Sequence, residues 1–230
     1  MSSNALNEQP LYYQGVALKA AADPRESIVY AVLIEFLALH KDPPWRFILY
    51  PQMSLKWKPQ DPQDLRQEIT DLGIINITPE AFKLRCGVEA KHATPIMAQL
   101  PNAKYIQHNL EVRDAFFAAY CQAADQAKAA FKNNYCLDSE HPIDWMLVVG
   151  PYWTPVELGP FSEAQLTVRT HKQSSSEDFE GRLDLELFLE QPPPELLELY
   201  CFNSQSSFER IEEILNETAA AAEPLINVII

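Results

Sequence analysis

The segment Phe82–Lys91 constrains the fold most, because its apolar and polar positions alternate along its whole length. Successive side chains of a β-strand point to opposite faces of the sheet, so this pattern predicts a strand with one apolar and one polar face. The predicted apolar face carries Phe82, Leu84, Cys86, Val88 and Ala90. The predicted polar face carries Lys83, Arg85, Gly87, Glu89 and Lys91. The protein therefore contains a sheet in which Glu89 and Lys91 are neighbours on one face.

A second strand is predicted over residues 71–78, where an apolar run is followed by a short turn at Pro79. If the turn is centred at Glu80, Asp71 lies opposite Glu89. Directly opposed residues share a face, with Cβ atoms about 4.5–5.5 Å apart. Two carboxylates at that separation repel each other unless a cation lies between them, and Mg²⁺ is suited to oxygen ligands. A register error of one residue would place the two carboxylates on opposite faces.

The rest of the chain predicts an α-β-β-β-α-β order and hence a mixed α/β (α+β) class. A helix is expected to begin at Asp23-Pro24, since Asp is a favourable N-cap and Pro favours the first turn. The other expected elements are a strand over 46–58 broken near Pro51, a long amphipathic helix over 109–132, a strand over 144–149 with a further strand after it, and helices over 163–190, 194–200 and 207–222.

The net charge of −14 comes from one part of the chain. Residues 138–230 carry 4 basic and 18 acidic side chains, whereas residues 41–137 carry 12 and 10. We divide the chain into an N-terminal arm (1–22), a core (23–162) and an acidic helical C-terminal extension packed on the core (163–230). With an excess of only 12 − 10 = +2, the middle region would bind a phosphate backbone weakly and with strong salt dependence. The acidic extension would shield the site, mimic a nucleic acid or dock a basic protein partner.

Missing motifs exclude several classes of protein. With only six glycines, the chain has no G-x-G-x-x-G or P-loop pattern, and it also lacks G-x-S-x-G, H-E-x-x-H and EF-hand patterns. Its four cysteines lack C-x-x-C spacing, which predicts buried free thiols. The N-terminal sequence has no signal-peptide features, and no apolar run approaches the roughly 18 residues of a membrane helix. We expect a soluble intracellular protein, cytoplasmic or nuclear, without a membrane partner.

The predicted strand pair carries a family motif. Asp71 at the head of an apolar strand, with Glu89-Ala90-Lys91 at the end of the next, resembles the D…(D/E)-x-K motif of the PD-(D/E)XK nuclease superfamily. The element order over residues 23–150 matches the core of that superfamily, although Thr70 stands where the motif usually has Pro. The resemblance implies a restriction-endonuclease-like core, with a mixed central sheet flanked by helices. The segment Gly150–Phe161 and the chain as a whole also resemble uncharacterised fungal proteins, which by itself indicates no activity.

The resemblance implies metal-dependent hydrolysis of phosphodiester bonds, in DNA more than in RNA. Asp71, Glu89 and the carbonyl of Ala90 would hold Mg²⁺ or Mn²⁺, which polarises the phosphate and lowers the pKa of a bound water. Lys91 would orient or activate that water and offset negative charge at the phosphorus.

The superfamily often adds polar residues from two helices. Glu26, near the start of the first helix, is the preferred candidate for the additional acid, and Glu35 is the alternative. On the helix that follows the motif, Gln126 and Gln122 are one turn apart and either could face the site.

Other interpretations of these residues stay open. Alternating charges are ordinary on an exposed strand, and the domain could be an α/β fold of unrelated topology. A nuclease-like scaffold could also have lost cleavage and bind a protein through its acidic C-terminal helices. Among neighbouring residues, His92 is expected on the opposite face or in the following loop, Trp145 in the core, and Trp153 half-buried.

Overall fold

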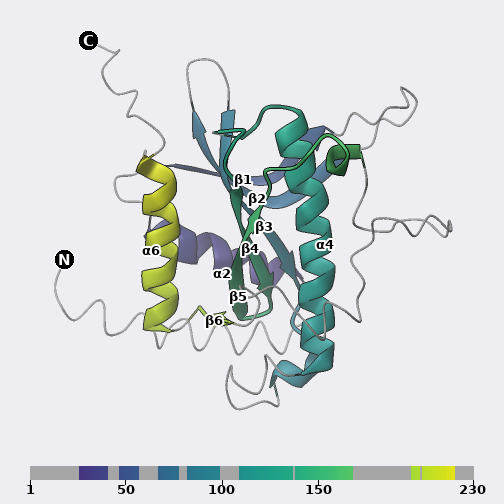
Figure 1. The fold of residues 1–230 in the computed structure, drawn as a ribbon. Helices are drawn as coiled ribbons and strands as arrows, with labels where there is room; N and C mark the ends of the chain where they lie inside the picture. The colour runs from purple at the N-terminus through teal and green to yellow at the C-terminus, as the bar shows by residue number, and fades with distance from the viewer. Residues whose placement is uncertain are drawn as a thin grey trace, which may run out of the picture.

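The computed structural model describes residues 26–40, 47–56, 67–77, 82–98, 109–136, 138–167, 198–202 and 204–220 (Figure 1). Its helices are α2 (Glu26–Leu39), α4 (Leu110–Lys132) and α6 (Gln205–Ala220), with short 3-10 helices η1 (Pro95–Ala98) and η2 (Gln165–Thr167). Its strands are β1 (Ile48–Lys56), β2 (Gln67–Ile77), β3 (Phe82–Lys91), β4 (Ile143–Val149), β5 (Tyr152–Leu158) and β6 (Tyr200–Cys201). The predicted N-terminal arm and the predicted helix over 163–190, from residue 168 onward, lie outside the described residues.

The six strands form one mixed sheet in the order β1-β2-β3-β4-β5-β6. Neighbouring strands are antiparallel except for β3 and β4, which run parallel. The chain passes from β3 to β4 through α4, as a parallel pair requires a long crossover connection. The mixed α/β class and the α-β-β-β-α-β order predicted from the sequence are therefore confirmed.

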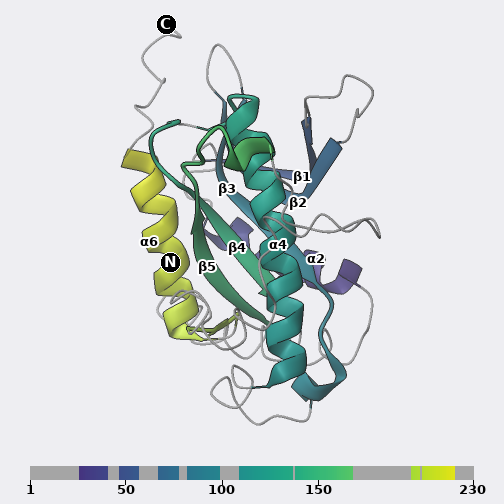
Figure 2. The same ribbon diagram turned by 45° about the vertical axis from the view of Figure 1, so that its right-hand side comes forward.

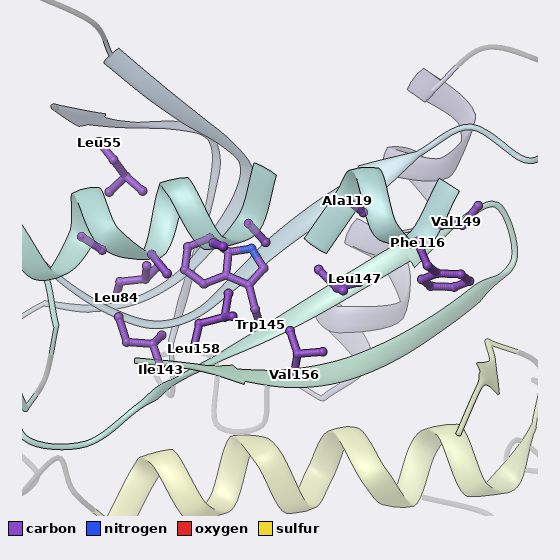
Figure 3. Packing of buried hydrophobic residues seen from close by; sticks show 14 of the residues in the cluster. Leu55, Leu84, Phe116, Ala119, Ile143, Trp145, Leu147, Val149, Val156 and Leu158 are labelled. Carbon is purple, nitrogen blue, oxygen red and sulfur yellow. The ribbon is translucent and has the colours of Figure 1, made fainter. Parts of the chain in front are cut away.

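Helices cover both faces of the sheet (Figures 1 and 2). On one face, α4 packs against a core that contains Trp145, Leu147 and Val149 of β4 (Figure 3). On the other face, α2 and α6 share a core with Met146 and Val148. Consecutive residues of β4 therefore enter different cores, which explains why this strand is apolar from Trp145 to Val149. No described helix is long and apolar enough to cross a membrane.

Helix α4 follows the sequence pattern closely. Asn109 caps it, and its side-chain oxygen accepts hydrogen bonds from the backbone N–H groups of Glu111 (3.0 Å) and Val112 (3.3 Å). The predicted packing face is buried at Phe116, Ala123, Ala127 and Ala130, with Tyr120 and Phe131 partly buried against the same core.

The β2–β3 hairpin has the predicted register near the candidate site but a different register near its turn. From Leu72–Val88 to Ile74–Cys86, paired residue numbers sum to 160, whereas from Ile75–Leu84 to Ile77–Phe82 they sum to 159. A β-bulge at Arg85 accounts for the difference, because it adds one residue to β3. The pairs nearest the turn thus differ by one residue from the predicted register, and beyond the bulge the pairing is the one that the sequence predicted.

The bulge also overturns the predicted faces of the first half of β3. Leu84 belongs to the core under α4, whereas Cys86 belongs to the core under α2 and α6. Arg85 is buried, and its guanidinium donates hydrogen bonds to the carbonyl of Leu215 in α6 (2.5 Å) and to Asn76 Oδ1 (3.4 Å). The expectation that Leu84 and Cys86 share a face, with Arg85 beside Glu89, is wrong.

Several boundaries and burial states differ from the predictions. Strand β2 begins at Gln67, four residues before the predicted start at Asp71. Tyr200, predicted at the end of a helix, begins β6, so the C-terminal segment adds a strand to the sheet. Trp153 is fully buried rather than half-buried, because it packs in the core under α2 and α6. Its indole N–H donates to the buried Ser207 hydroxyl of α6 (2.6 Å). As predicted, Trp145 is fully buried.

The four cysteines are free, in agreement with the prediction of free thiols. Cys86, Cys121 and Cys136 are buried, and Cys201 is partly buried. Burial raises the pKa of Cys121 and of Cys136 to about 12. These thiols therefore behave as small apolar side chains of the core.

Candidate active site

The candidate active site lies at the end of β3, on the sheet face that α4 covers. Glu89 is completely buried there, while Asp71 and Lys91 are partly exposed. Asp71 directly precedes Leu72, whose partner is Val88, so the same register brings Asp71 beside Glu89. The backbone N–H of Ala90 donates a hydrogen bond to Asp71 Oδ2 (2.7 Å). This bond holds the Asp71 carboxylate against β3 between Glu89 and Lys91.

Thr70 fixes the backbone on which Asp71 sits. Its hydroxyl is buried and donates to the carbonyl of Val88 on β3 (2.9 Å), and it lies 3.2 Å from the carbonyl of Leu72. Thr70 occupies the position where the family motif usually has proline. Its side chain joins β2 to β3 one residue before Asp71.

The ammonium group of Lys91 lies between a carboxylate and an amide. Nζ donates to Glu89 Oε1 (2.5 Å) and to Gln122 Oε1 of α4 (2.8 Å). Glu89 and Lys91 project from the same face of β3, because they are two residues apart on a strand beyond the bulge. The predicted neighbourhood of Glu89 and Lys91 is present, and Gln122 adds a second contact to the lysine.

Gln126 connects α4 to both strands of the site. Its Nε2 donates to Glu89 Oε2 (2.7 Å) and to the carbonyl of Ile69 on β2 (2.9 Å). Gln126 is completely buried, and its Oε1 has no hydrogen-bond partner among the described residues. A buried acceptor without a partner is costly, so this oxygen is positioned to accept from a water or a ligand group.

The electrostatics of Glu89 follow from this environment. Burial raises the pKa of its carboxyl from the usual 4.5 to about 7, and the negative charge of Asp71 adds to the rise. The positive charge of Lys91 and the hydrogen bonds from Lys91 and Gln126 oppose the rise, because they stabilise the ionised form. A carboxyl with a pKa near neutrality, beside a second carboxylate, is typical of functional sites.

The two candidate acids of the first helix have different positions. Glu26 is the first residue of α2, but its side chain lies outside the described residues. Glu35 is exposed on α2, which packs on the opposite face of the sheet from Glu89. His92 is exposed in the loop after β3, in agreement with the expectation that it lies in that loop. Within the described ranges, no three His, Cys, Asp or Glu side chains form a metal-binding cluster.

Sequence reasoning missed one residue beside the site. Gln52 of β1 lies between the pairs Pro51–Leu72 and Met53–Thr70, and is therefore opposite Asp71. Its backbone has φ +52°, in the left-handed region that residues with a side chain rarely adopt. The signal in the sequence is Pro51, which predicts a break in the strand but not the left-handed conformation of residue 52.

Comparisons with protein-family models, with curated proteins and with solved structures find no match to this chain. The resemblance to the PD-(D/E)XK superfamily accordingly stays a prediction that depends on the motif, the element order and the geometry of the site.

Proposed function

We propose that the protein is a metal-dependent nuclease of the PD-(D/E)XK type, with a restriction-endonuclease-like core that hydrolyses phosphodiester bonds, most favourably in DNA. One observation carries the proposal. Asp71, Glu89 and Lys91 come together at the end of β3, and Gln126 reaches across from α4 to hold Glu89. This is the set of residues that the motif and the helix after it would supply to such a site.

The donor set fits a hard divalent cation. Asp71 and Glu89 offer carboxylate oxygens and Ala90 a carbonyl oxygen, which are the ligand types that Mg²⁺ and Mn²⁺ prefer. Although each oxygen of Glu89 accepts one hydrogen bond, a carboxylate has about four acceptor positions, so capacity for a ligand interaction remains. The unpartnered Oε1 of Gln126 adds a buried acceptor for a metal-bound or free water. When bound, such a cation polarises the phosphate and lowers the pKa of a water ligand.

The other roles in the proposed reaction, which are charge stabilisation and the orientation of the ligands, belong to residues of the chain. Lys91 presents a positive charge held in place by Glu89 and Gln122, where it would stabilise negative charge on the phosphate and orient the attacking water. Gln126 orients the Glu89 carboxylate, and the backbone N–H of Ala90 orients Asp71. Lys91 therefore contacts the substrate, whereas Gln126 is a positioning residue.

The proposal is tested by incubating the full chain with labelled single-stranded DNA, duplex DNA and RNA, in the presence of Mg²⁺, Mn²⁺ or EDTA. We expect cleavage that requires the cation and falls about 100-fold or more in Asp71→Asn and in Lys91→Ala. Lys83→Ala is the matched control, because Lys83 lies on the same strand and bonds only to Asn134 in the described contacts.

Cleavage that is unchanged in both site variants would overturn the proposal. The other candidate function, a nuclease-like scaffold that binds a basic protein through the acidic C-terminal region, predicts a different result. In that case the wild-type chain cleaves no nucleic acid with either cation, while its protein binding is lost when the acidic residues of α6 are neutralised.

A further inference from the structure

The β1–β2 ladder is interrupted at the position opposite Asp71. All residues of β1 pair with β2 except Gln52, which takes the left-handed backbone conformation directly after Pro51. For a residue with a Cβ, that conformation is less favourable than the right-handed one, because Cβ comes too close to the following carbonyl oxygen. Such strain is found most often at functional sites, and here it lies next to Asp71, one of the candidate metal ligands.

The interruption changes which residues of β1 face α4. Ile48, before it, and Met53 and Leu55, after it, all pack in the core under α4. In an uninterrupted strand, residue 48 would share its face with 50, 52 and 54 instead. The left-handed residue therefore lets both halves of β1 bury their apolar side chains, and leaves Gln52 exposed at the surface beside Asp71.

Tyr50 lies on the same sheet face as the site. It is directly opposite Gly73, and opposed residues of an antiparallel pair share a face. The face of Gly73 is contacted by Met53, Leu84 and Ile75, all of which belong to the core under α4. Tyr50 is nevertheless 45% exposed, so much of its ring remains available for contact.

Tyr50 is also close to Asp71. Gln52 is directly opposite Asp71, so Tyr50, two residues before Gln52, is the diagonal neighbour of Asp71 across the β1–β2 pair. Diagonal neighbours in a ladder are about 7–8 Å apart, a distance that an aromatic side chain can span. An exposed ring and an exposed amide therefore border the carboxylate end of the site.

We infer that Tyr50 and Gln52 hold a nucleotide that flanks the scissile phosphate, and that the substrate is single-stranded. This inference rests on the proposed nuclease function. The ring of Tyr50 stacks on an unpaired base, and the Gln52 amide bonds to the sugar, phosphate or base edge of the same nucleotide. A base inside a duplex is already stacked on its neighbours, so the contact favours single strands or frayed ends.

The charge distribution supports a contribution from stacking. Residues 41–137, which contain the site, have a net charge of only +2, and the whole chain has −14. Nucleic-acid binding by phosphate contacts alone would be weak for such a chain. Base stacking on an aromatic side chain does not depend on the net charge of the protein, so it would add to such weak phosphate contacts.

The test measures binding of labelled oligonucleotides in EDTA by fluorescence anisotropy, together with cleavage in Mg²⁺ or Mn²⁺. We expect the wild-type chain to bind single-stranded DNA more tightly than its duplex. Tyr50→Ala should weaken binding of the single strand by about 10-fold, while Tyr50→Phe, which keeps the ring, should retain it. A strand with abasic sites should bind the wild type and Tyr50→Ala equally.

Phe82→Ala is the matched control. Phe82 is an exposed aromatic residue (50%) at the start of β3, seven residues from Glu89 and hence about 23 Å away along the strand. Its removal should leave binding and cleavage unchanged. Thermal unfolding of each variant within a few degrees of the wild type shows that the folded state is retained.

Three outcomes separate the inference from the function on which it rests. If the wild type cleaves, Lys91→Ala does not, and Tyr50→Ala binds and cleaves like the wild type, the inference fails while the nuclease function stands, and a protein partner for Tyr50 is favoured. If Tyr50→Ala weakens binding of the intact strand and of the abasic strand by the same factor, Tyr50 does not stack on a base, and the inference fails. If the wild type neither binds nor cleaves any nucleic acid, both proposals fail.

Discussion

The two faces of the sheet are both buried, but they bury different kinds of side chain. The face under α2 and α6 is apolar along β3 beyond the bulge at Arg85, where Cys86, Val88 and Ala90 enter the core. The face under α4 is apolar around Trp145 but carries Glu89 and Lys91 at the end of the same strand. Beyond the bulge, one strand thus supplies apolar side chains to one helix layer and a polar cluster to the other.

The difference indicates what each face is for. Burying charged groups costs free energy, and well-packed apolar residues would stabilise the same position as well or better. The polar cluster is therefore better explained by chemistry than by stability. On the opposite face, the described buried charged groups are separate: Arg85 bonds to the carbonyl of Leu215, and His40 lies 2.6 Å from Glu212. The predictions below test whether the two faces differ in this way.

The largest effect is expected from filling the space beside the site. A Cβ at Gly87 would lie 2.2 Å from the indole ring of Trp145, which is itself fully buried and has little room to move. We expect Gly87→Ala to lower the free energy of unfolding by about 3 kcal/mol, measured by chemical denaturation.

Gly73→Ala is the control, because Gly73 pairs with Gly87 in the β2–β3 ladder. A Cβ there would lie 2.7 Å from the sulfur of Met53, the far end of a flexible side chain. The loss should be about 1 kcal/mol. Equal losses in the two variants would show that the core around Trp145 is not tightly packed.

A pH-dependent effect is expected from Glu89, on the polar face. Its pKa is about 7 in the folded protein against a usual value of 4.5, so the folded state binds this proton more tightly than the unfolded state. The associated stability is fully present below about pH 4.5 and is lost as the pH rises to about 7 and above. The expected loss is about 3 kcal/mol, measured by denaturation in EDTA between pH 5 and pH 8.

Glu89→Gln removes this titration while keeping the shape of the side chain. The variant should show a smaller loss of stability between pH 5 and pH 8 than the wild type, and it should be inactive if Glu89 is a metal ligand. Identical pH dependence in the two proteins would contradict the raised pKa. Comparing the two proteins removes the contributions of other titrating groups to the pH dependence.

A smaller effect is expected from the two buried tryptophans, one on each face. The indole N–H of Trp153 donates to Ser207, whereas that of Trp145 has no partner among the described residues. Both substitutions to Phe lose apolar volume, but Trp153→Phe also leaves a buried hydroxyl without its donor. We expect Trp153→Phe to cost about 1 kcal/mol more in unfolding free energy than Trp145→Phe. If Trp145→Phe cost more than Trp153→Phe, the assignment of a hydrogen-bond partner to the indole N–H of Trp153 but not to that of Trp145 would be wrong.

The smallest effect is expected at the interruption of β1. Gln52→Gly relieves the left-handed strain and should raise the free energy of unfolding by up to about 1 kcal/mol. Gln52→Val should lower it, because a β-branched residue tolerates this conformation least. If the two variants have the same thermal unfolding midpoint, the left-handed conformation is not required for the fold.

The strand pair and its key pairing could be predicted from the sequence because both depend on local features. Alternation in Phe82–Lys91 and the short turn before it define two strands and an approximate register. Near the turn, the observed pairing nevertheless differs by one residue from the predicted register. The bulge at Arg85 adds one residue to β3, so the observed and predicted registers agree again at Asp71 and Glu89. A bulge depends on how both strands pack against their helices, and alternation in one strand does not contain that information.

The site was predicted in part. Asp71, Glu89, Lys91 and Gln126 were identified from the motif and from helical spacing, but the bonds of Gln126 to Ile69 and of Lys91 to Gln122 were not. These contacts join α4 to β2 and β3, and their partners are far apart in the chain. Helical spacing left Gln122 and Gln126 as alternatives, whereas the structure uses both, one for the lysine and one for the glutamate.

The sequence by itself determined the amphipathic helix α4, the strand β3 and the shared face of Glu89 and Lys91 at its end, the position of the charged residues and the small net charge of the region around the motif. The tertiary structure decided which of these residues meet: Tyr50 and Gln52 reach the site only because β1 pairs with β2 in one register and is interrupted opposite Asp71. Local patterns follow from the preferences of neighbouring residues. Contacts between elements follow from the packing of the two cores as a whole, which is a property of the folded chain.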